Sequence, residues 1–309
     1  MGMMRSVLLW GSQNAWLRKT LPRYGFVRSA VTRFMPGETA DDALAAAERL
    51  REDGLTTVLT QLGENIASVD EASAVAAHYR DVLDKISARK LECHVSVKLT
   101  QLGLDLSPDI CFNNLESIVR HAKTLNNFVW VDMEYSQYVD VTLDVYTRAR
   151  TAHPNVGLCV QAYLYRTAKD LEALLKIPAA IRLVKGAYAE PEDVAYRRKE
   201  DVDKNYYAFA LHLLQNPRPN HVRSGIATHD RALIRRIQGA TDSMKLPKDA
   251  VEFQLLYGIQ REEQLRLVRE GYKTRVLISY GSYWFPWYMR RLAERPANIW
   301  FVVKNMFAR

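Results

Sequence analysis

Short apolar runs alternate with longer amphipathic segments along most of this chain. Brief apolar or alternating runs are typical of strands, whereas apolar residues spaced three and four apart are typical of helices. On this pattern we predict eight strands, at residues 55–62, 92–99, 128–133, 156–162, 180–184, 221–227, 250–255 and 274–279. A helical pattern fills every gap between them.

The predicted helices have recognisable starts and ends. Thr39, followed by Asp42 three residues later, predicts a capped helix start. Pro108 suits a first turn, and Gly54 and Gly271 follow predicted helix ends. The predicted helices span residues 39–53, 69–89, 108–125, 138–152, 167–176, 193–214, 231–238, 262–270 and 284–294.

Strands and helices that alternate eight times predict an α/β fold, a closed parallel (βα)8 barrel of the TIM type. No shift in composition marks a boundary inside it, so we expect a single barrel domain over residues 38–309, including a C-terminal helix, and a basic helical arm over residues 1–37. An open doubly wound sheet is the alternative. It is less favoured because no G-x-G-x-x-G follows a strand and no P-loop is present.

Composition describes an ordinary globular chain of 309 residues, 48% hydrophobic and 25% charged, long enough to bury a sizeable core. Its three cysteines are well separated, which predicts reduced thiols in a cytosol-like compartment. No apolar run is long enough to span a bilayer. The sequence has no H-E-x-x-H spacing, calcium loop or G-x-S-x-G elbow, so we expect no metal and no serine triad.

The formal charge of +8 lies at the two ends of the chain. Residues 1–37 carry six basic and no acidic residues, residues 290–309 carry +4, and the middle is therefore slightly acidic. This distribution excludes a uniformly basic nucleic-acid binder. Five of the six tryptophans also lie near the ends. Basic and aromatic residues together are typical of membrane-surface contacts, although packing of terminal helices explains any single tryptophan more simply.

These ends also bear on the compartment. The expectation is a cytoplasmic protein, with a peripheral contact at the inner face of a membrane as a further hypothesis. The acid-free arm has the composition of a transit peptide as well, and that interpretation would make the protein mitochondrial. Aromatic residues in the arm, such as Trp10 and Phe34, favour a retained, packed segment.

Active sites of barrels lie at the carboxyl ends of the strands, and each predicted strand ends in polar residues. These residues are Glu64, Lys98, Asp132, Glu134, Gln161, Tyr163, Arg182, Lys185, Tyr188, Thr228, His229, Asp230, Glu252, Gln254, Tyr257 and Tyr280, followed by Arg290 and Arg291. Any one of them has a structural explanation, such as a salt bridge inside the barrel. Together they predict a cation-rich rim that suits an anionic substrate, an anionic cofactor, or both.

The fifth predicted strand is the most informative stretch. It reads Arg182-Leu-Val-Lys-Gly-Ala-Tyr188, an apolar strand that ends in a cation and small residues. Small residues let the backbone approach a flat or anionic ligand closely. A buried strand with a glycine turn is the simpler interpretation of this stretch taken alone.

Eight motifs in order, from about residue 36 to 298, resemble the monofunctional, FAD-dependent proline dehydrogenase family. They are Leu62-Gly-Glu64, Ser96-Val-Lys-Leu99, Val131-Asp-Met-Glu134, Gln161-Ala-Tyr163, Arg182-Leu-Val-Lys-Gly-Ala-Tyr188, Ala227-Thr-His229, Glu252-Phe-Gln-Leu-Leu-Tyr-Gly258 and Arg290-Arg-Leu-Ala-Glu-Arg-Pro-Ala-Asn298. The resemblance implies a flavoprotein oxidoreductase on a distorted eight-stranded barrel. It also implies that L-proline is oxidised to Δ1-pyrroline-5-carboxylate by hydride transfer to FAD, the first step of proline catabolism, with a quinone-type acceptor for the electrons.

The resemblance assigns roles to individual residues. Lys98, Arg290 and Arg291 would bind the proline carboxylate, with Asp132 ordering the site. Glu64 would pair with Arg290 as a gate, and Glu294 would hold an arginine. Tyr188 and Leu256 would border the substrate ring. The residues expected to contact FAD are Gln161, Arg182, Val184, Lys185, Gly186, Ala187, Thr228 and His229, with Arg182 near the flavin N5.

Three positions depart from the family pattern. Leu277 and Trp287 stand where tyrosines are expected around the substrate ring, and Ala189 stands where a tryptophan commonly follows Gly-Ala-Tyr. These departures leave open a preference for hydroxyproline or a ring homologue of proline. Two other functions also stay open from the residues alone: a barrel aldolase or lyase with Lys185 or Lys98 as Schiff-base amine, and a non-catalytic module that binds anionic polymers.

Overall fold

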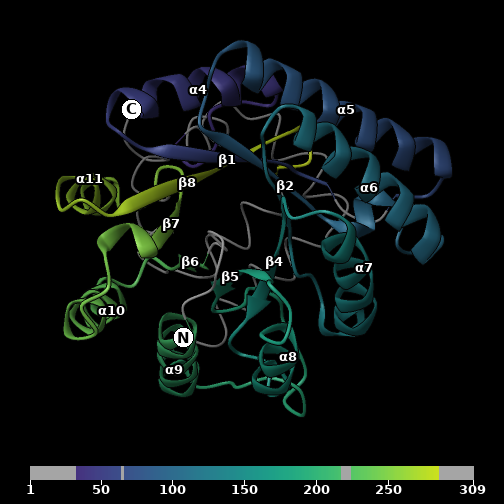
Figure 1. The fold of residues 1–309 in the computed structure, drawn as a ribbon. Coiled ribbons are helices and arrows are strands. Elements are labelled where there is room, and N and C mark those ends of the chain that lie inside the picture. The colour runs from purple at the N-terminus through teal and green to yellow at the C-terminus, as the bar shows by residue number, and fades with distance from the viewer. Residues whose placement is uncertain (1–32, 64–65, 217–223, 285–309) are drawn as a thin grey trace, which may run out of the picture.

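Eight parallel strands close into a barrel in the computed structural model, which describes residues 33–63, 66–216 and 224–284 (Figure 1). The strands are β1 Thr56–Gln61, β2 Cys93–Val97, β3 Val129–Val131, β4 Val156–Gln161, β5 Ala180–Val184, β6 Ser224–Ala227, β7 Glu252–Leu256 and β8 Lys273–Tyr280. Each pairs in parallel with the next, and β8 pairs with β1 from Arg275↔Thr56 to Tyr280↔Gln61. The predicted closed barrel is confirmed.

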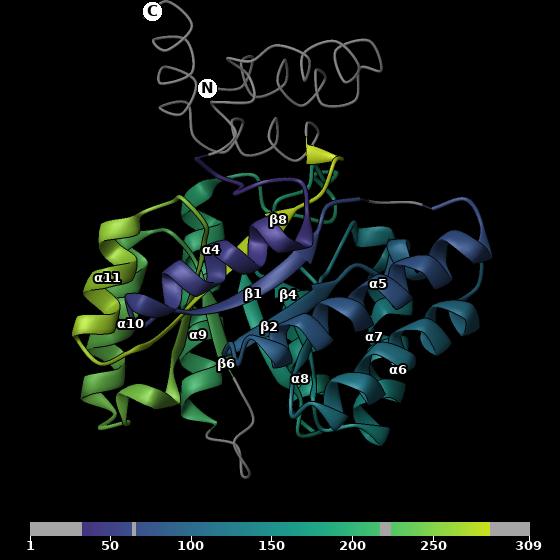
Figure 2. The same ribbon diagram turned by 90° about the horizontal axis from the view of Figure 1, so that it is seen from above.

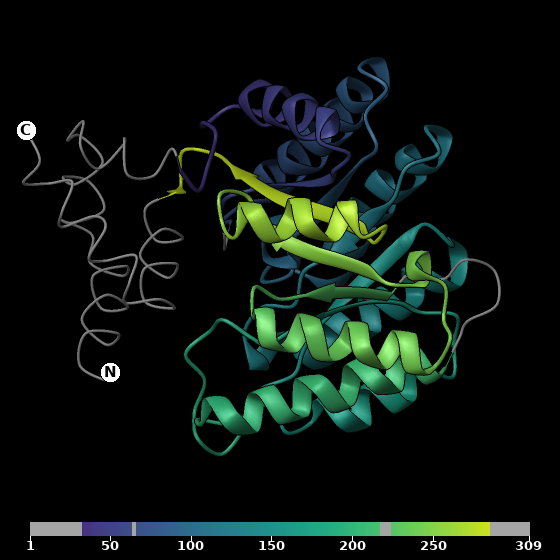
Figure 3. The ribbon, with the colours of Figure 1, turned by 90° about the vertical axis from the view of Figure 1, so that its left-hand side faces the viewer.

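Helices surround the strands on the outside (Figure 1). They are α4 Ala40–Glu52, α5 Val69–Ala88, α6 Pro108–Thr124, α7 Val139–Ala152, α8 Thr167–Leu174, α9 Lys199–Gln215, α10 Arg231–Ser243 and α11 Arg261–Arg269, with short 3-10 helices η2 Leu99–Leu102, η3 Ser136–Tyr138 and η4 Lys248–Ala250. Figure 2 shows α4 lying across β1 and β8. Figure 3 shows α9 and α10, in green, side by side. None of the helices in the described ranges is long and apolar enough to cross a membrane.

Side chains at the helix starts explain where several helices begin. The Thr39 hydroxyl accepts the Asp42 amide at 3.1 Å, and the Asp42 carboxylate accepts the Thr39 amide at 3.0 Å, which is the predicted capping box. Ser107 precedes Pro108 and accepts the Asp109 amide at 3.2 Å. These helix starts are therefore set by contacts within a few residues of sequence.

The predicted helix over residues 193–214 is wrong at its start, because α9 begins only at Lys199. Residues 192–194 form a turn, and residues 194–196 pair with the chain after β4. The Tyr165 amide donates to the Val194 carbonyl at 3.1 Å, and the Tyr196 amide donates to the Tyr163 carbonyl at 2.8 Å. Since these backbone groups already have partners in another loop, they are not available for a helix. The prediction for α10 was too short, since this helix continues past Gly239 to Ser243.

The barrel interior has an apolar layer and a charged layer. Val58, Phe128, Trp130 and Ala180 form a buried cluster against which Leu277 packs. The fully buried Arg275 guanidinium donates to the two carboxylate oxygens of Glu252 at 2.9 and 3.1 Å.

Because of this ion pair, the prediction that Glu252 and Gln254 lie at the carboxyl-end rim is wrong. Glu252 is the first residue of β7, at the amino end of the strand, and Gln254 donates to its carboxylate at 2.7 Å. Both side chains are therefore structural parts of the barrel interior. A second, larger core lies between the strands and the surrounding helices.

Candidate active site

Asp132 is the centre of the polar cluster at the carboxyl ends of β2, β3 and β5. Its Oδ1 accepts a hydrogen bond from the Arg182 guanidinium at 3.0 Å, and its Oδ2 lies 3.7 Å from the Lys98 ammonium. The Arg182 side chain is 3% exposed, and those of Lys98 and Asp132 are 12% and 19% exposed. One carboxylate is thus shared between two cations, so this cluster carries one positive charge in excess.

Ser96 completes this cluster and was not among the predicted site residues. It is fully buried, its hydroxyl donates to Asp132 Oδ1 at 2.7 Å, and its oxygen accepts from the Arg182 guanidinium at 3.0 Å. Side chains alternate along a strand, so Ser96 faces the same side as Lys98. That period of two is the sequence pattern that points to Ser96.

Arg182 has donors left over for a ligand. Its guanidinium carbon lies 4.6 Å from the Trp130 ring, which supports it from one side. Its Nε and Nη2 are buried, and neither has a hydrogen-bond partner among the residues that the structure describes. A buried donor without a partner costs about 1–3 kcal/mol, so a polar ligand at this point would be stabilised.

Gln161, at the end of β4, has a similar unsatisfied atom. Its amide group donates to the carbonyls of Met133 and Glu134 at 3.3 and 3.1 Å, whereas its buried Oε1 has no partner in the described ranges. A ligand group with both acceptors and donors, such as the ring edge of a flavin, could accept hydrogen bonds from the Arg182 guanidinium and donate one to Gln161 Oε1. The residues present therefore fit the cofactor that the resemblance implies.

Glu134 supports the backbone beside Lys98. It is 4% exposed, and its two carboxylate oxygens accept the Thr100 amide at 3.1 Å and the Thr100 hydroxyl at 2.6 Å. Thr100 belongs to η2, which follows Lys98 directly. Glu134 thereby ties the end of β3 to the segment that carries the lysine, which is a structural role at the rim.

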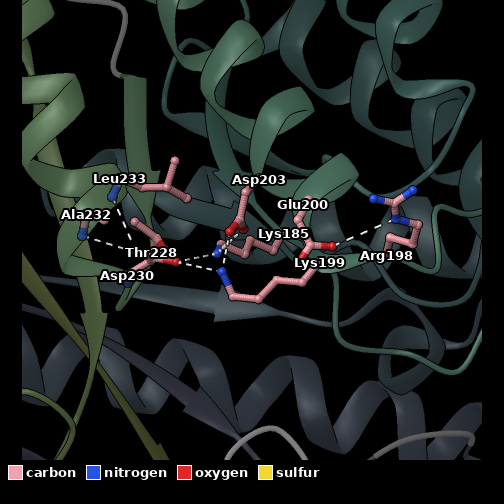
Figure 4. Close-up of polar contacts among 9 residues, drawn as sticks. All are labelled: Lys185, Arg198, Lys199, Glu200, Asp203, Thr228, Asp230, Ala232 and Leu233. Carbon is pink, nitrogen blue, oxygen red and sulfur yellow. Dashed lines mark hydrogen bonds and ion pairs between the residues drawn. The ribbon is translucent and has the colours of Figure 1, made fainter.

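A second charged cluster lies at the carboxyl ends of β5 and β6 (Figure 4). The Lys185 ammonium pairs with Asp203 and with Asp230, the latter at 3.0 Å. Lys199 pairs with the same two carboxylates, at 3.2 Å from Asp230. Lys199 and Asp203 were missed, although their spacing of four residues on a predicted helix is typical of an ion pair.

Asp230 also caps α10. Its Oδ1 accepts the amides of Ala232 and Leu233 at 3.1 and 3.4 Å. Burial acts to raise the pKa of Asp230, but the Lys185 and Lys199 ammoniums and the capped amides outweigh it and hold the pKa well below its usual value. The carboxylate is therefore charged throughout the neutral range. The Asp230 amide donates to the Thr228 hydroxyl at 3.2 Å, which places predicted residues Thr228 and His229 in the turn between β6 and α10.

The segment after β5 passes very close to β4. Val184 ends the strand, and Gly186 has a φ of +114°. A Cβ on Gly186 would lie 2.2 Å from the Tyr163 ring, so only glycine fits there. Ala187 follows with no bulky side chain. The structure thus explains this glycine by packing against Tyr163, and the approach of a ligand to the backbone at this point stays a prediction.

The residues predicted to border the substrate ring lie on two sides of the rim. The Tyr188 ring centroid is 4.3 Å from that of Tyr135. Leu256 ends β7 and is opposite Leu277 in the register with β8. Leu277 therefore lies inside the barrel, against the layer that contains Trp130.

Several predicted residues are outside the described ranges: Glu64, Trp287, Arg290, Arg291 and Glu294. Among the residues that are described, no group of three or more histidine, cysteine or acidic side chains could hold a metal ion. Burial raises the pKa of the three thiols, Cys93, Cys111 and Cys159, to about 12, so they are neutral at physiological pH.

The fold and the rim define a (βα)8-barrel enzyme with a cation-rich site at the carboxyl ends of its strands. Comparison with known proteins identifies the family. The family model described as proline dehydrogenase matches residues 43–304, and the chain belongs to this family. Membership of this family argues against both alternative functions, the barrel aldolase or lyase and the non-catalytic module that binds anionic polymers.

Proline dehydrogenases of other organisms are similar in sequence over most of this chain. Proline dehydrogenase 1 of Bacillus subtilis (strain 168) is 37% identical over 305 residues, which cover 98% of this chain and 99% of the relative. Proline dehydrogenase of Deinococcus radiodurans is 36% identical over 89% of each chain. The crystal structure of proline utilization A (PutA) from Bdellovibrio bacteriovorus, inactivated by N-propargylglycine, matches with a TM-score of 0.80 and 26% identity. That match covers 94% of this chain and 36% of the PutA chain.

Proposed function

We propose that this enzyme oxidises L-proline to Δ1-pyrroline-5-carboxylate, the first step of proline catabolism, with FAD as its cofactor. The observation that carries the proposal is the sharing of Asp132 between Lys98 and Arg182. It joins the lysine expected to bind the substrate carboxylate to the arginine expected to face the flavin. Substrate and cofactor would then meet over one buried cluster.

The excess positive charge suits the substrate carboxylate. Of the two cations in the cluster, the Lys98 ammonium is the more exposed, and it lies 3.7 Å from Asp132 Oδ2. A carboxylate bound at Lys98 would neutralise the cluster in a largely water-excluded place, where the ion pair is stronger than in water. Arg290 and Arg291, predicted to complete the clamp, are outside the described residues.

Oxidation of the ring removes two electrons and two protons from proline. The C5–H bond breaks, a C=N bond forms between C5 and the ring nitrogen, and the amine proton leaves to solvent. When bound, the flavin supplies the acceptor for the C5 hydrogen, which leaves with the electron pair of its bond as a hydride. The protein binds and orients the substrate: Lys98 holds the carboxylate, and Tyr188 and Leu256 flank the ring and exclude water.

The residues that would hold FAD come from β4, β5 and β6. Gln161 and Arg182 offer the unpaired atoms described above. The segment at Gly186 and Ala187 would let the backbone approach the cofactor. Lys185, after β5, and Lys199, the first residue of α9, are already paired with Asp203 and Asp230, so they would add only partly exposed cations beside the cofactor. Thr228 and His229 would contact the cofactor from the adjoining turn.

A quinone-type electron acceptor and a peripheral membrane contact are further parts of the proposal. Both rest on the basic, tryptophan-containing ends of the sequence, residues 1–37 and 290–309. The enzyme would then work in the cytoplasm at the inner face of a membrane. Flotation with anionic liposomes at low salt tests this, and a protein that stays unbound under those conditions contradicts it.

Ring selectivity is a second question. Leu277 has no hydroxyl and packs against the interior layer that contains Val58 and Trp130. The rim near β7 and β8 is therefore apolar at Leu256 and Leu277, which favours the unsubstituted proline ring over hydroxyproline. A ratio of kcat/KM for the two substrates near one would contradict this preference.

An absorbance spectrum tests the reaction and the cofactor together. The purified protein is expected to show flavin bands, and anaerobic L-proline is expected to bleach them. A flavin-loaded protein that proline does not reduce would show that the substrate is wrong. A colourless protein that does not take up added FAD would show that the cofactor is wrong.

A further inference from the structure

The long connection between β5 and α9, residues 185–198, is anchored differently in its two halves. The second half is held by backbone, through the antiparallel bridge Leu164↔Ala195 and the hydrogen bonds of Val194 and Tyr196. The first half carries Tyr188, which is predicted to border the substrate. Its first residue is also held by backbone, since the Lys185 carbonyl accepts the Tyr163 amide at 2.9 Å, and side chains connect the following residues to the neighbouring segments.

Glu190 provides the strongest of these side-chain contacts. Its Oε1 accepts the Ser136 amide at 2.8 Å, and its Oε2 accepts the Ser136 hydroxyl at 2.6 Å. The Tyr163 hydroxyl lies 3.5 Å from Oε1. Burial, together with the nearby Glu190 charge, raises the pKa of Tyr163, so this hydroxyl stays protonated and able to donate. One carboxylate therefore connects the chain after β5 to the segments after β3 and β4.

These contacts reach Tyr188 through the neighbouring Tyr135. Ser136 follows Tyr135, whose ring packs on the Tyr188 ring at 4.3 Å. Residues 135–136 and 188–190 thus touch at two points, one between rings and one between a carboxylate and its donors. Ala189, between the two points, is exposed and has only a methyl group. The Glu190 carboxylate and the packing of Tyr135 on Tyr188 therefore both hold this part of the loop.

We infer that Glu190 is a positioning residue that holds Tyr188 at the substrate side of the rim. The inference rests on the proposed proline oxidation, because it gives Tyr188 its role. Glu190 would set the affinity for the substrate ring with little influence on the cofactor, since Gln161, Arg182 and Lys185 are held by contacts of their own.

The test compares Glu190→Gln with Glu192→Gln in the FAD-loaded enzyme. Glu192 is in the same loop, but its side chain is 75% exposed and pairs with the exposed Arg197 at 3.1 Å. The amide in Glu190→Gln cannot accept from both groups of Ser136. We expect its KM for L-proline to rise about tenfold, as for the loss of one charge-assisted hydrogen bond, with a smaller change in kcat and unchanged flavin content. Glu192→Gln should match the wild type.

Ser136→Ala keeps the amide donor and removes the hydroxyl, so it should give a smaller rise in KM. The double variant should be less impaired than the product of the single effects, because both changes break the same contact. A KM within twofold of the wild type in Glu190→Gln, or equal losses of flavin and activity, would overturn the inference. Wild-type enzyme without any proline turnover would instead overturn the proposed function, and this inference with it.

Discussion

Two charged clusters at the rim have similar side chains and different surroundings. The Asp132 cluster is nearly closed to solvent, has two cations for one carboxylate, and leaves two buried nitrogens of Arg182 unpaired in the described structure. The Lys185 cluster balances two lysines with two aspartates, and its side chains range from 20% to 69% exposed. The first is incomplete without a ligand, whereas the second is satisfied by its own members.

This difference favours the buried cluster as the site of the proposed chemistry. A cation that is desolvated and underneutralised attracts an anionic group strongly, while ion pairs in contact with water contribute about 0–1 kcal/mol. Changes in the Asp132 cluster should therefore have large effects that salt does not alter. Changes in the Lys185 cluster should have small effects that salt weakens.

The largest effect is expected for Asp132→Asn. It leaves Lys98 and Arg182 without their shared counter-charge, and breaking a buried ion pair costs about 3 kcal/mol or more, which is roughly a hundredfold. We expect kcat/KM for proline to fall by at least that factor at both low and high salt. Asp140→Asn, which removes a carboxylate that is 83% exposed and paired with Arg166, is the matched control.

Ser96→Ala should have the next largest effect. It removes a donor to Asp132 and an acceptor of Arg182 in a fully buried place. The cost of about 1.5 kcal/mol corresponds to roughly tenfold in kcat/KM. Ser117→Ala is a suitable control, because Ser117 also makes two hydrogen bonds but lies on α6. If Ser96→Ala were as active as the wild type, Ser96 would have no role in positioning Asp132 and Arg182 for the reaction.

Lys185→Gln addresses the other cluster. We expect the affinity for FAD to fall about fivefold at low salt, as for a partly exposed ion pair of about 1 kcal/mol, and the KM for proline to stay unchanged. Fluorescence titration of the flavin at two salt concentrations measures this, with the exposed Lys169→Gln as control. If Lys185→Gln lost more than the hundredfold expected for Asp132→Asn, or if salt did not reduce its loss of FAD affinity, the two clusters would not differ in the way described.

The smallest effect is expected for Asp230→Asn. Asparagine also caps helices, so the change isolates the charge. Because the folded-state pKa of Asp230 is lowered, its charge stabilises the fold above the unfolded value of about 3.9 and loses this contribution as the pH falls below it. Urea unfolding should show the variant about 1 kcal/mol less stable at pH 7, with the gap closing toward about pH 3. A gap that stays constant over this range would contradict the charge effect.

Most of the fold could be predicted because its pattern is local. Eight short apolar strands that alternate with amphipathic helices are typical of a closed parallel barrel. Thr39 and Pro108 mark helix starts through contacts within a few residues. The start of α9 could not be predicted, since residues 194–196 are held by Tyr163 and Tyr165 in another loop. Glu252 was misplaced for a related reason: its partner Arg275 is on the next strand.

The site was predictable by residue type and less so by contact. Strand ends and family motifs pointed to Lys98, Asp132 and Arg182, which the structure brings together. The direct contact between Asp132 and Arg182 could not be read from the sequence, because β4 separates their strands and the contact crosses the barrel interior. Lys199 and Asp203 are spaced in the sequence as a helical ion pair, but their place beside Lys185 and Asp230 depends on where α9 packs.

We propose that Asp132 couples Lys98, expected to bind the substrate carboxylate, to Arg182, expected to face the cofactor. The most direct measurement is the rate at which L-proline bleaches bound flavin under anaerobic stopped flow, in wild-type protein and in Asp132→Asn with equal flavin content. We expect rapid bleaching in the wild type and a rate roughly a hundredfold lower in the variant, with flavin still bound. Bleaching at the wild-type rate in Asp132→Asn would contradict it.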